Sequence, residues 1–191
     1  MSDSLRDPER LFQYEPYLRM LARVKHRQAY QAKVGASDIV QQSLLQAVQA
    51  IGDFRGSTEA ELRGWLRQIL ARNIAHLDRD MHRDKRDVRR ERSIEERMQK
   101  SSMRLEGWLA GGGPTPSQHA AVGEHVVQLA EAIERLPDGQ RDAVRMHYLE
   151  GLKLSEVASE LGKSTSAVAG LLHRGMKSLR SEFGEAKSAW G

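Results

Sequence analysis

Apolar side chains recur every three or four positions along most of this chain, as they do on one face of an α-helix. After Pro16, which suits the first turn of a helix, Leu18, Leu21, Ala22 and Val24 form such a stripe. The sustained alternation of apolar and polar residues that is typical of strands does not occur in the sequence. The pattern therefore predicts an all-α fold.

A second helix is predicted between Ser37, whose hydroxyl can cap its start, and Gly52, which ends it. Its apolar stripe consists of Val40, Leu44, Ala47, Val48 and Ile51. Two helices that each carry one apolar face can bury those faces against each other.

A third helix is predicted from the capping-box spacing of Thr58 and Glu61. Its stripe consists of Leu62, Leu66, Ile69, Leu70, Asn73 and Leu77. We expect Trp65 to lie in the core, although an aromatic side chain can also stack on a nucleic-acid base. The stretch HLDRDMHRDKRDVRRERSIEER that follows is almost wholly polar, so we expect most of it to face solvent or a ligand.

Glycine and proline interrupt the helical pattern in the middle of the chain, in KSSMRLEGWLAGGGPTPSQHAA. We predict a flexible linker over residues 99–121. It divides the chain into an N-terminal domain, residues 1–98, and a C-terminal domain, residues 122–187. Trp108 falls inside this linker.

Four short helices fit the C-terminal domain. The first has the stripe Val122, Val126, Leu129, Ala130, Ile133 and Leu136. Pro137 ends it, and Asp138 is placed to cap the next helix.

The stretch LKLSEVASELGKSTSAVAGLLHRGMKSLR is punctuated as a helix-turn-helix. Ser155 can cap a short helix, Gly162 allows a tight turn, and Ser164 can cap a second helix. The residues expected between the two helices are Val157, Ala158, Leu161, Val168, Leu171 and Leu172. The opposite side of the second helix is then free to enter a major groove of DNA, although an ordinary helical hairpin would show the same caps.

Composition narrows the function further. The chain has 191 residues, no cysteine, and 30 Lys and Arg against 26 Asp and Glu, a formal net charge of +4. Without cysteine there is no disulfide, thiolate metal site or cysteine nucleophile. We find no phosphate-binding glycine loop and no histidine spacing for a metal, so we expect no enzyme activity, cofactor or metal site. With no apolar run of about 20 residues and no signal peptide, we expect a cytoplasmic protein.

The segment AIERLPDGQRDAVRMHYLEGLKLSEVASELGKSTSAVAGLLHRGMKSLR resembles region 4 of bacterial RNA polymerase sigma factors. Upstream, GASDIVQQSLLQAV, FRG and LRGWLRQILARNIAHLDRD with the basic run after them resemble region 2, in the order that the family has. The linker is too short for a separate region 3. This arrangement is similar to that of the extracytoplasmic-function (ECF, group 4) sigma factors of the sigma-70 family.

The resemblance implies that region 2 binds the β′ clamp of core RNA polymerase and the unpaired −10 element. The candidates for the polymerase contact are Asp38, Gln41 and Gln42, which could equally form an ordinary solvated helix face. The candidates for −10 DNA are Arg72, Asn73, His76, Arg79, Arg83, Lys85 and Arg86. Asp78, Asp80, Asp84 and Asp87 lie among these bases and could pair with them instead.

The resemblance also implies that region 4 reads the −35 duplex and contacts the β flap of the polymerase. The candidates are Ser164, Thr165, Ser166, His173, Arg174 and Lys177. Hydroxyls and amides at a helix N-terminus can bind phosphate, and the two cations add charge. The middle of this helix is Ala169, Gly170 and Leu171, where the family often has polar or basic residues, so we expect phosphate contacts and DNA shape to contribute more than base contacts.

Two other functions fit part of the sequence. A conventional helix-turn-helix regulator would bind duplex operator DNA without polymerase. A helical adaptor would bind neither DNA nor polymerase. The resemblance further implies an anti-sigma factor as an inhibitory partner and, for Trp108, a path through the polymerase; Trp108 could instead cover an interface between the domains.

Overall fold

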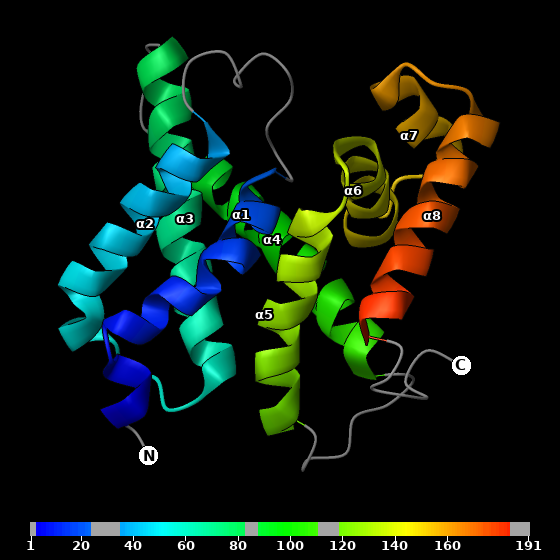
Figure 1. Ribbon diagram of the computed structural model, residues 1–191. Helices are drawn as coiled ribbons and strands as arrows, with labels where there is room; N and C mark the ends of the chain where they lie inside the picture. Colours follow the sequence, from blue (N-terminus) through cyan, green and yellow to red (C-terminus); the bar gives the residue numbers. More distant parts are fainter. Residues whose placement is uncertain (1–2, 24–34, 83–87, 111–118, 184–191) are drawn as a thin grey trace. The chain divides into compact units, whose positions relative to one another are not determined.

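The structure, a computed structural model, describes residues 3–23, 35–82, 88–110 and 119–183. Every element in these ranges is a helix, which confirms the all-α prediction (Figure 1). The chain divides into two compact units, Met1–Gln99 and Lys100–Gly191.

The first unit is built around three α-helices. Its elements are η1 (Asp3–Arg6), η2 (Glu9–Tyr14), α1 (Glu15–Arg23), α2 (Ala36–Ala50), η3 (Ile51–Asp53), α3 (Glu59–His82) and the first half of α4 (Val88–Ala110). The predicted stripes of α1, α2 and α3 meet in its core. Leu18, Leu21, Leu44, Leu66 and Leu70 are each at most 2% exposed. Burying side chains of this size contributes about 1.5–3 kcal/mol each, so these stripes account for the packing of the unit.

The start of α3 is the capping box that the sequence predicts. The Thr58 hydroxyl accepts a hydrogen bond from the backbone N–H of Glu61 at 3.2 Å, and the Glu61 carboxylate accepts one from the N–H of Thr58 at 3.0 Å. The N–H of Ser57 also donates to this carboxylate, at 2.8 Å. Donors that would otherwise lack a partner at the helix N-terminus are thereby satisfied.

These contacts make the contribution of Glu61 to stability depend on pH. The hydrogen bonds from the backbone of Ser57 and from Thr58 hold the pKa of the Glu61 carboxyl below its ordinary value of 4.5. A lowered carboxyl pKa stabilises the fold above that value, and the stabilisation is lost as the pH falls through the lowered pKa. We expect Glu61→Gln to lower the urea midpoint of unfolding at neutral pH and to have a smaller effect well below pH 4.5. A difference between the two proteins that stays constant with pH would contradict this account.

The start of α2 differs from the prediction. The helix begins at Ala36, its N-cap is Gly35, and Ser37 lies inside the first turn. The Asp38 carboxylate accepts a hydrogen bond from the N–H of Gly35 at 3.2 Å. Ser37 was therefore wrong as the cap, because the carboxylate of the third helical residue satisfies the donor instead.

Trp65 is half-buried, and its ring packs against Phe54 with 5.4 Å between centroids.

The second unit contains the rest of α4, α5 (His119–Arg135), α6 (Asp138–Val144), the π-helical turn η5 (Arg145–Leu149), α7 (Leu154–Leu161) and α8 (Thr165–Phe183). The predicted stripe of α5 lies in its core. Val126, Leu129 and Ile133 are fully buried, together with Val157 of α7 and Val168 of α8.

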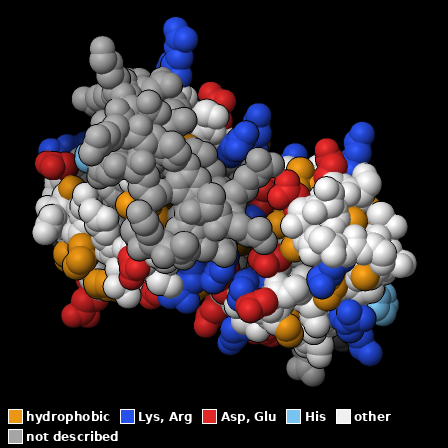
Figure 2. Space-filling model, turned by 90° about the horizontal axis from the view of Figure 1, so that it is seen from above, with side chains coloured by type: hydrophobic (Ala, Val, Ile, Leu, Met, Phe, Trp, Pro, Cys, Tyr) orange, Lys and Arg blue, Asp and Glu red, His pale blue; other side chains and the backbone are white. Residues whose placement is uncertain are grey.

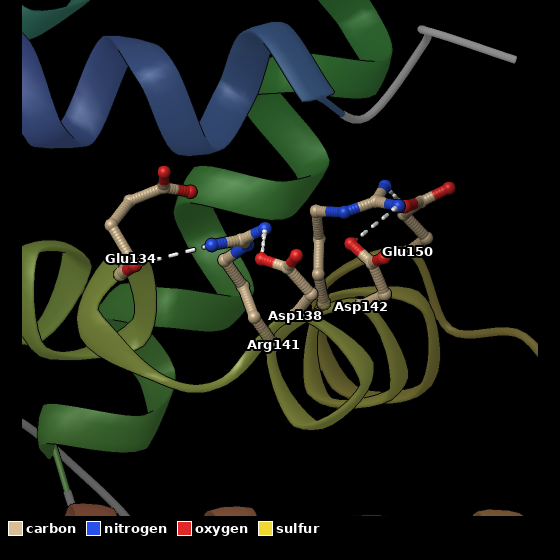
Figure 3. Close-up of polar contacts among 6 residues, drawn as sticks. Glu134, Asp138, Arg141, Asp142 and Glu150 are labelled. Atoms are coloured by element: carbon tan, nitrogen blue, oxygen red, sulfur yellow. Dashed lines mark hydrogen bonds and ion pairs between the residues drawn. The ribbon is translucent and has the colours of Figure 1, made fainter. Parts of the chain in front are cut away.

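Two predicted caps in this unit are wrong by one or two residues. The N-cap of α6 is Pro137, and Asp138 is the first helical residue, where its carboxylate accepts a hydrogen bond from Arg141 at 2.5 Å (Figure 3). The N-cap of α7 is Lys153, not Ser155. The Glu156 carboxylate accepts the N–H of Lys153 at 2.6 Å, so a side chain three residues later closes this turn.

Both ends of the predicted linker are helical in the structure. Residues 99–110 continue α4, residues 111–118 lie outside the described part of the chain, and α5 begins at His119. Helical spacing persists beyond Gln99, since Ser101 and Leu105 are 1% and 0% exposed. Their burial gives this part of α4 a packed face that the glycine-rich sequence downstream obscured.

Candidate nucleic-acid interface

The turn between α7 and α8 has the geometry that the sequence predicts. Gly162 has a φ of 60° and ends α7 in the left-handed conformation. The N–H of Lys163 donates to the carbonyl of Ala158 at 2.9 Å, which completes a C-cap. The Ser164 hydroxyl accepts the N–H of Ala167 at 3.2 Å and so caps α8.

One side of α8 is buried against α6 and α7. Of the residues predicted to lie between the two helices, Val157, Ala158, Val168 and Leu172 are buried, whereas Leu161 and Leu171 are partly exposed. A Cβ on Gly175 would lie 2.9 Å from a methyl carbon of Val144, so glycine is what allows α8 to approach α6 closely. This packing fixes which side of α8 faces outward.

The outward side of α8 carries the predicted duplex-binding residues. These residues, all exposed, are Ser164, Thr165, Ser166, His173, Arg174 and Lys177. The first three surround the N-terminus of the helix, and the other three follow about two to three turns later. The structure thus leaves all six exposed along α8 and at its N-terminus, and we call this set the α8 face.

The predicted −10 residues are distributed differently. Arg72 and His76 are exposed on α3, and the Nε of Arg72 lies 3.7 Å from the carboxylate of Glu91 on α4. For Arg79 the structure describes the helical backbone alone, and Arg83, Lys85 and Arg86 lie outside the described residues.

Asn73 belongs to the core of the first unit. It is 9% exposed, and its amide nitrogen donates to the Ser43 hydroxyl of α2 at 2.9 Å. Ser43 in turn donates to the carbonyl of Ile39 at 2.7 Å. We therefore correct its assignment: the amide joins α3 to α2 and is not part of the exposed surface that could meet a base, because a buried polar group needs a partner inside the protein.

The exposed face of α2 contains the three predicted polymerase-binding residues, Asp38, Gln41 and Gln42. They lie on the same side of the helix as Leu45, which is 58% exposed. Sequence analysis missed Leu45, although its position opposite the buried stripe of α2 could have revealed it. Asp38 also has the capping role described above.

Residues 127–179, from α5 into α8, match the family model described as Sigma-70, region 4. This match contains the helix-turn-helix and all of the α8 face. The second unit therefore resembles region 4 of the sigma-70 family, and we call it the region 4 unit.

The chain is also similar to curated proteins that are named as sigma factors. The chain is 27% identical over 150 residues to the ECF RNA polymerase sigma factor SigD of Mycobacterium bovis and to that of Mycobacterium tuberculosis, a match that covers 78% of this chain and 64% of each relative. It is 29% identical over 148 residues to the probable RNA polymerase sigma factor RfaY of Xanthomonas campestris pv. campestris, over 78% of this chain and 34% of the relative. The matched part therefore spans less than two thirds of the length of these relatives.

Within this region 4 unit, Arg174 compensates for the small residues in the middle of α8. A Cβ on Gly170 would lie 3.3 Å from a guanidinium nitrogen of Arg174, so the arginine extends over the glycine. Its five donors can bind a phosphate or a guanine edge. The guanidinium of Arg174, from the next turn, thus lies where Ala169 and Gly170 offer no polar side chain.

A shallow cavity of about 300 Å³ adjoins the α8 face. It is lined by Tyr148, Leu172, His173, Met176, Lys177 and Arg180. Tyr148, Met176 and Arg180 were not singled out from the sequence. Arg180 lies one turn beyond Lys177 and could have been found by helical spacing, whereas Tyr148 comes from η5 and depends on the tertiary structure.

On the face that Figure 2 presents, Lys and Arg side chains are interleaved with Asp and Glu. The described residues contain no cluster of three or more His, Asp or Glu side chains that could hold a metal ion. None of the helices within the described ranges is long and apolar enough to cross a membrane.

Proposed function

We propose that this chain is an alternative sigma factor, which binds core RNA polymerase and directs it to promoters with −10 and −35 elements. The observation that carries the proposal is the coincidence of the region 4 match with a helix-turn-helix whose outward helix face exposes hydroxyls and cations. A helix N-terminus that carries Ser164 and Ser166 suits phosphate binding, and Arg174 and Lys177 extend the contact along the groove. The role is that of a non-enzymatic subunit acting in the cytoplasm.

The α2 face is our candidate for the contact with the β′ clamp. An exposed leucine that shares its helix face with the amides of Gln41 and Gln42 is typical of a protein-binding surface, because an apolar centre can be desolvated at low cost. Arg72 and His76 on α3 are the described candidates for contacts with −10 DNA. The contacts of Arg79, Arg83, Lys85 and Arg86, the contact with the β flap and the anti-sigma partner stay predictions.

The deciding experiment is run-off transcription on genomic promoter fragments with purified bacterial core polymerase, with and without this protein. We expect specific transcripts that appear when the protein is added. A protein that binds duplex operator DNA by itself and never associates with core polymerase would instead be a conventional regulator, and the proposal would be wrong.

A charge placed at the centre of the α2 face tests the polymerase contact. We expect Leu45→Glu to weaken binding to core polymerase by about tenfold or more, because truncation or charging of a central interface residue commonly costs 1–3 kcal/mol. The measurement is a titration of labelled protein with core polymerase. Met103→Glu is the matched control, since Met103 is a similarly exposed apolar residue, at 62%, on α4. Equal loss in both variants would rule out a specific role for Leu45.

A further inference from the structure

Three side chains from the second half of α4 contact η5 at one place within the second unit. The Ser101 hydroxyl donates to the carbonyl of Leu149 at 3.1 Å, and the Arg104 guanidinium donates to the same carbonyl at 2.9 Å. The ring of Trp108 meets that of Tyr148 edge-to-face, with 4.8 Å between centroids. Residues 101, 104 and 108 share one side of a helix. We call Ser101, Arg104 and Trp108 the brace.

The place where the brace binds is structurally unusual. Leu149 ends the π-helical turn η5, and the last carbonyls of a helix lack an intrahelical donor. Two side chains from α4 satisfy the Leu149 carbonyl instead, and Leu149 itself is fully buried. The hydrogen bond of a guanidinium to a carbonyl is charge-assisted, so it is stronger than an ordinary one.

The backbone at Gly151 is shaped around Arg104. A Cβ on Gly151 would lie 2.6 Å from two guanidinium nitrogens and 2.8 Å from the central carbon. Gly151 also has a φ of 76°, which disfavours other residues. Any side chain at this position would therefore displace the guanidinium.

The brace contacts an element that borders the α8 face without covering that face. Tyr148, which meets Trp108, lines the cavity together with His173 and Lys177 of α8. The six residues of the α8 face are nevertheless exposed while the brace is bound. The contact is thus arranged to hold the wall of the cavity, not to shield the DNA-binding surface.

We propose that the second half of α4 is a positioning element of the region 4 unit. The brace holds η5 in its π-helical geometry, fixes Tyr148 beside α8 and fixes the start of α7, which begins three residues after Gly151. Release of the brace lowers the population of the binding-competent unit, and the apparent promoter affinity falls in proportion. This consequence for promoters rests on the proposed function, whereas the effect on η5 does not.

Hydrogen exchange on the full-length protein tests the effect on η5. The amides to follow are those of Glu150 and Leu152, which donate at 3.0 Å to the carbonyls of Arg145 and Met146. We expect Arg104→Ala to accelerate exchange of peptides covering residues 145–152 by about tenfold, because a charge-assisted hydrogen bond is lost. Gly151→Ala should accelerate it at least as much.

The double variant separates the brace from backbone strain. Once Gly151→Ala has displaced the guanidinium, removing Arg104 as well should add little further acceleration. Gly162→Ala is the matched control, since Gly162 also has a positive φ, of 60°, but a Cβ there would meet nothing within 4 Å. Lys100→Ala controls for loss of an exposed positive charge on α4. Additive effects, or exchange at residues 145–152 that Arg104→Ala leaves unchanged, would overturn the inference.

Promoter binding by holoenzyme reconstituted with the same variants tests the consequence. We expect Arg104→Ala and Gly151→Ala to lower affinity several-fold without changing its dependence on salt. A decrease of about 0.9 in the salt slope would show that Arg104 binds a phosphate directly, and would overturn the positioning role. If the wild-type chain forms no holoenzyme, the proposed function fails, and the exchange experiment still decides whether the brace exists.

Discussion

Glu150→Gln is expected to destabilise the second unit by about 3 kcal/mol, because it removes the nearer of the two carboxylates that pair with the buried charge of Arg145. The Arg145 side chain is 7% exposed and forms ion pairs with Glu150 and, at 3.9 Å, with Asp142; both carboxylates are labelled in Figure 3. A change of this size shifts the folding equilibrium by more than about a hundredfold. Denaturant unfolding followed by circular dichroism measures it.

A compensating variant distinguishes a buried charge from lost packing. Arg145→Met in the Glu150→Gln protein removes the buried positive charge of Arg145 and introduces an apolar side chain of similar length. We expect this double variant to recover most of the lost stability. If it is no more stable than Glu150→Gln, the cost comes from other contacts of Glu150, and the ion pair is not what stabilises the turn.

Removal of both cations from the α8 face is the second large effect. For holoenzyme carrying Arg174→Ala and Lys177→Ala, we expect promoter affinity to fall by about tenfold to a hundredfold, since each charge-assisted contact contributes about 1 kcal/mol or more. The slope of log affinity against log salt concentration should become shallower by about 1.8, because two phosphate contacts are lost and each would have released counterions from the DNA. Filter binding across a salt series measures both quantities.

Arg6→Ala provides the control for net charge, since Arg6 is an exposed cation in the other unit. Its removal should leave the salt slope unchanged. If the double variant keeps the wild-type slope but loses affinity on selected sequences, then Arg174 or Lys177 reads bases instead of holding phosphates. Unchanged affinity and slope would remove both residues from the interface.

The two classes of effect identify different parts of the region 4 unit. The Arg145–Glu150 pair and the brace both act on η5, the π turn between α6 and α7. The cations of α8 act on DNA directly. Variants at η5 should therefore alter stability or the competent population, whereas variants at the α8 face should alter the salt dependence of binding.

The sequence by itself determined the features that depend on residues close together in the chain. The capping box of Thr58 and Glu61, the turn at Gly162 and the cap at Ser164 were all predicted correctly, because each is made within a few residues. The apolar stripes also located the core helices, since helical periodicity follows from local geometry. Caps failed at Ser37, Asp138 and Ser155, where several neighbouring side chains could satisfy the same donors.

Only the tertiary structure decided which polar residues face outward and which are used inside. Asn73 has the residue type and position of a DNA contact, yet its amide bonds Ser43, 30 residues earlier. Arg104 lies in a segment that resembles a linker, yet its guanidinium binds a carbonyl 45 residues later. Hydrogen bonds between residues so far apart leave no periodic signal in the sequence, because their geometry exists only after the helices have packed.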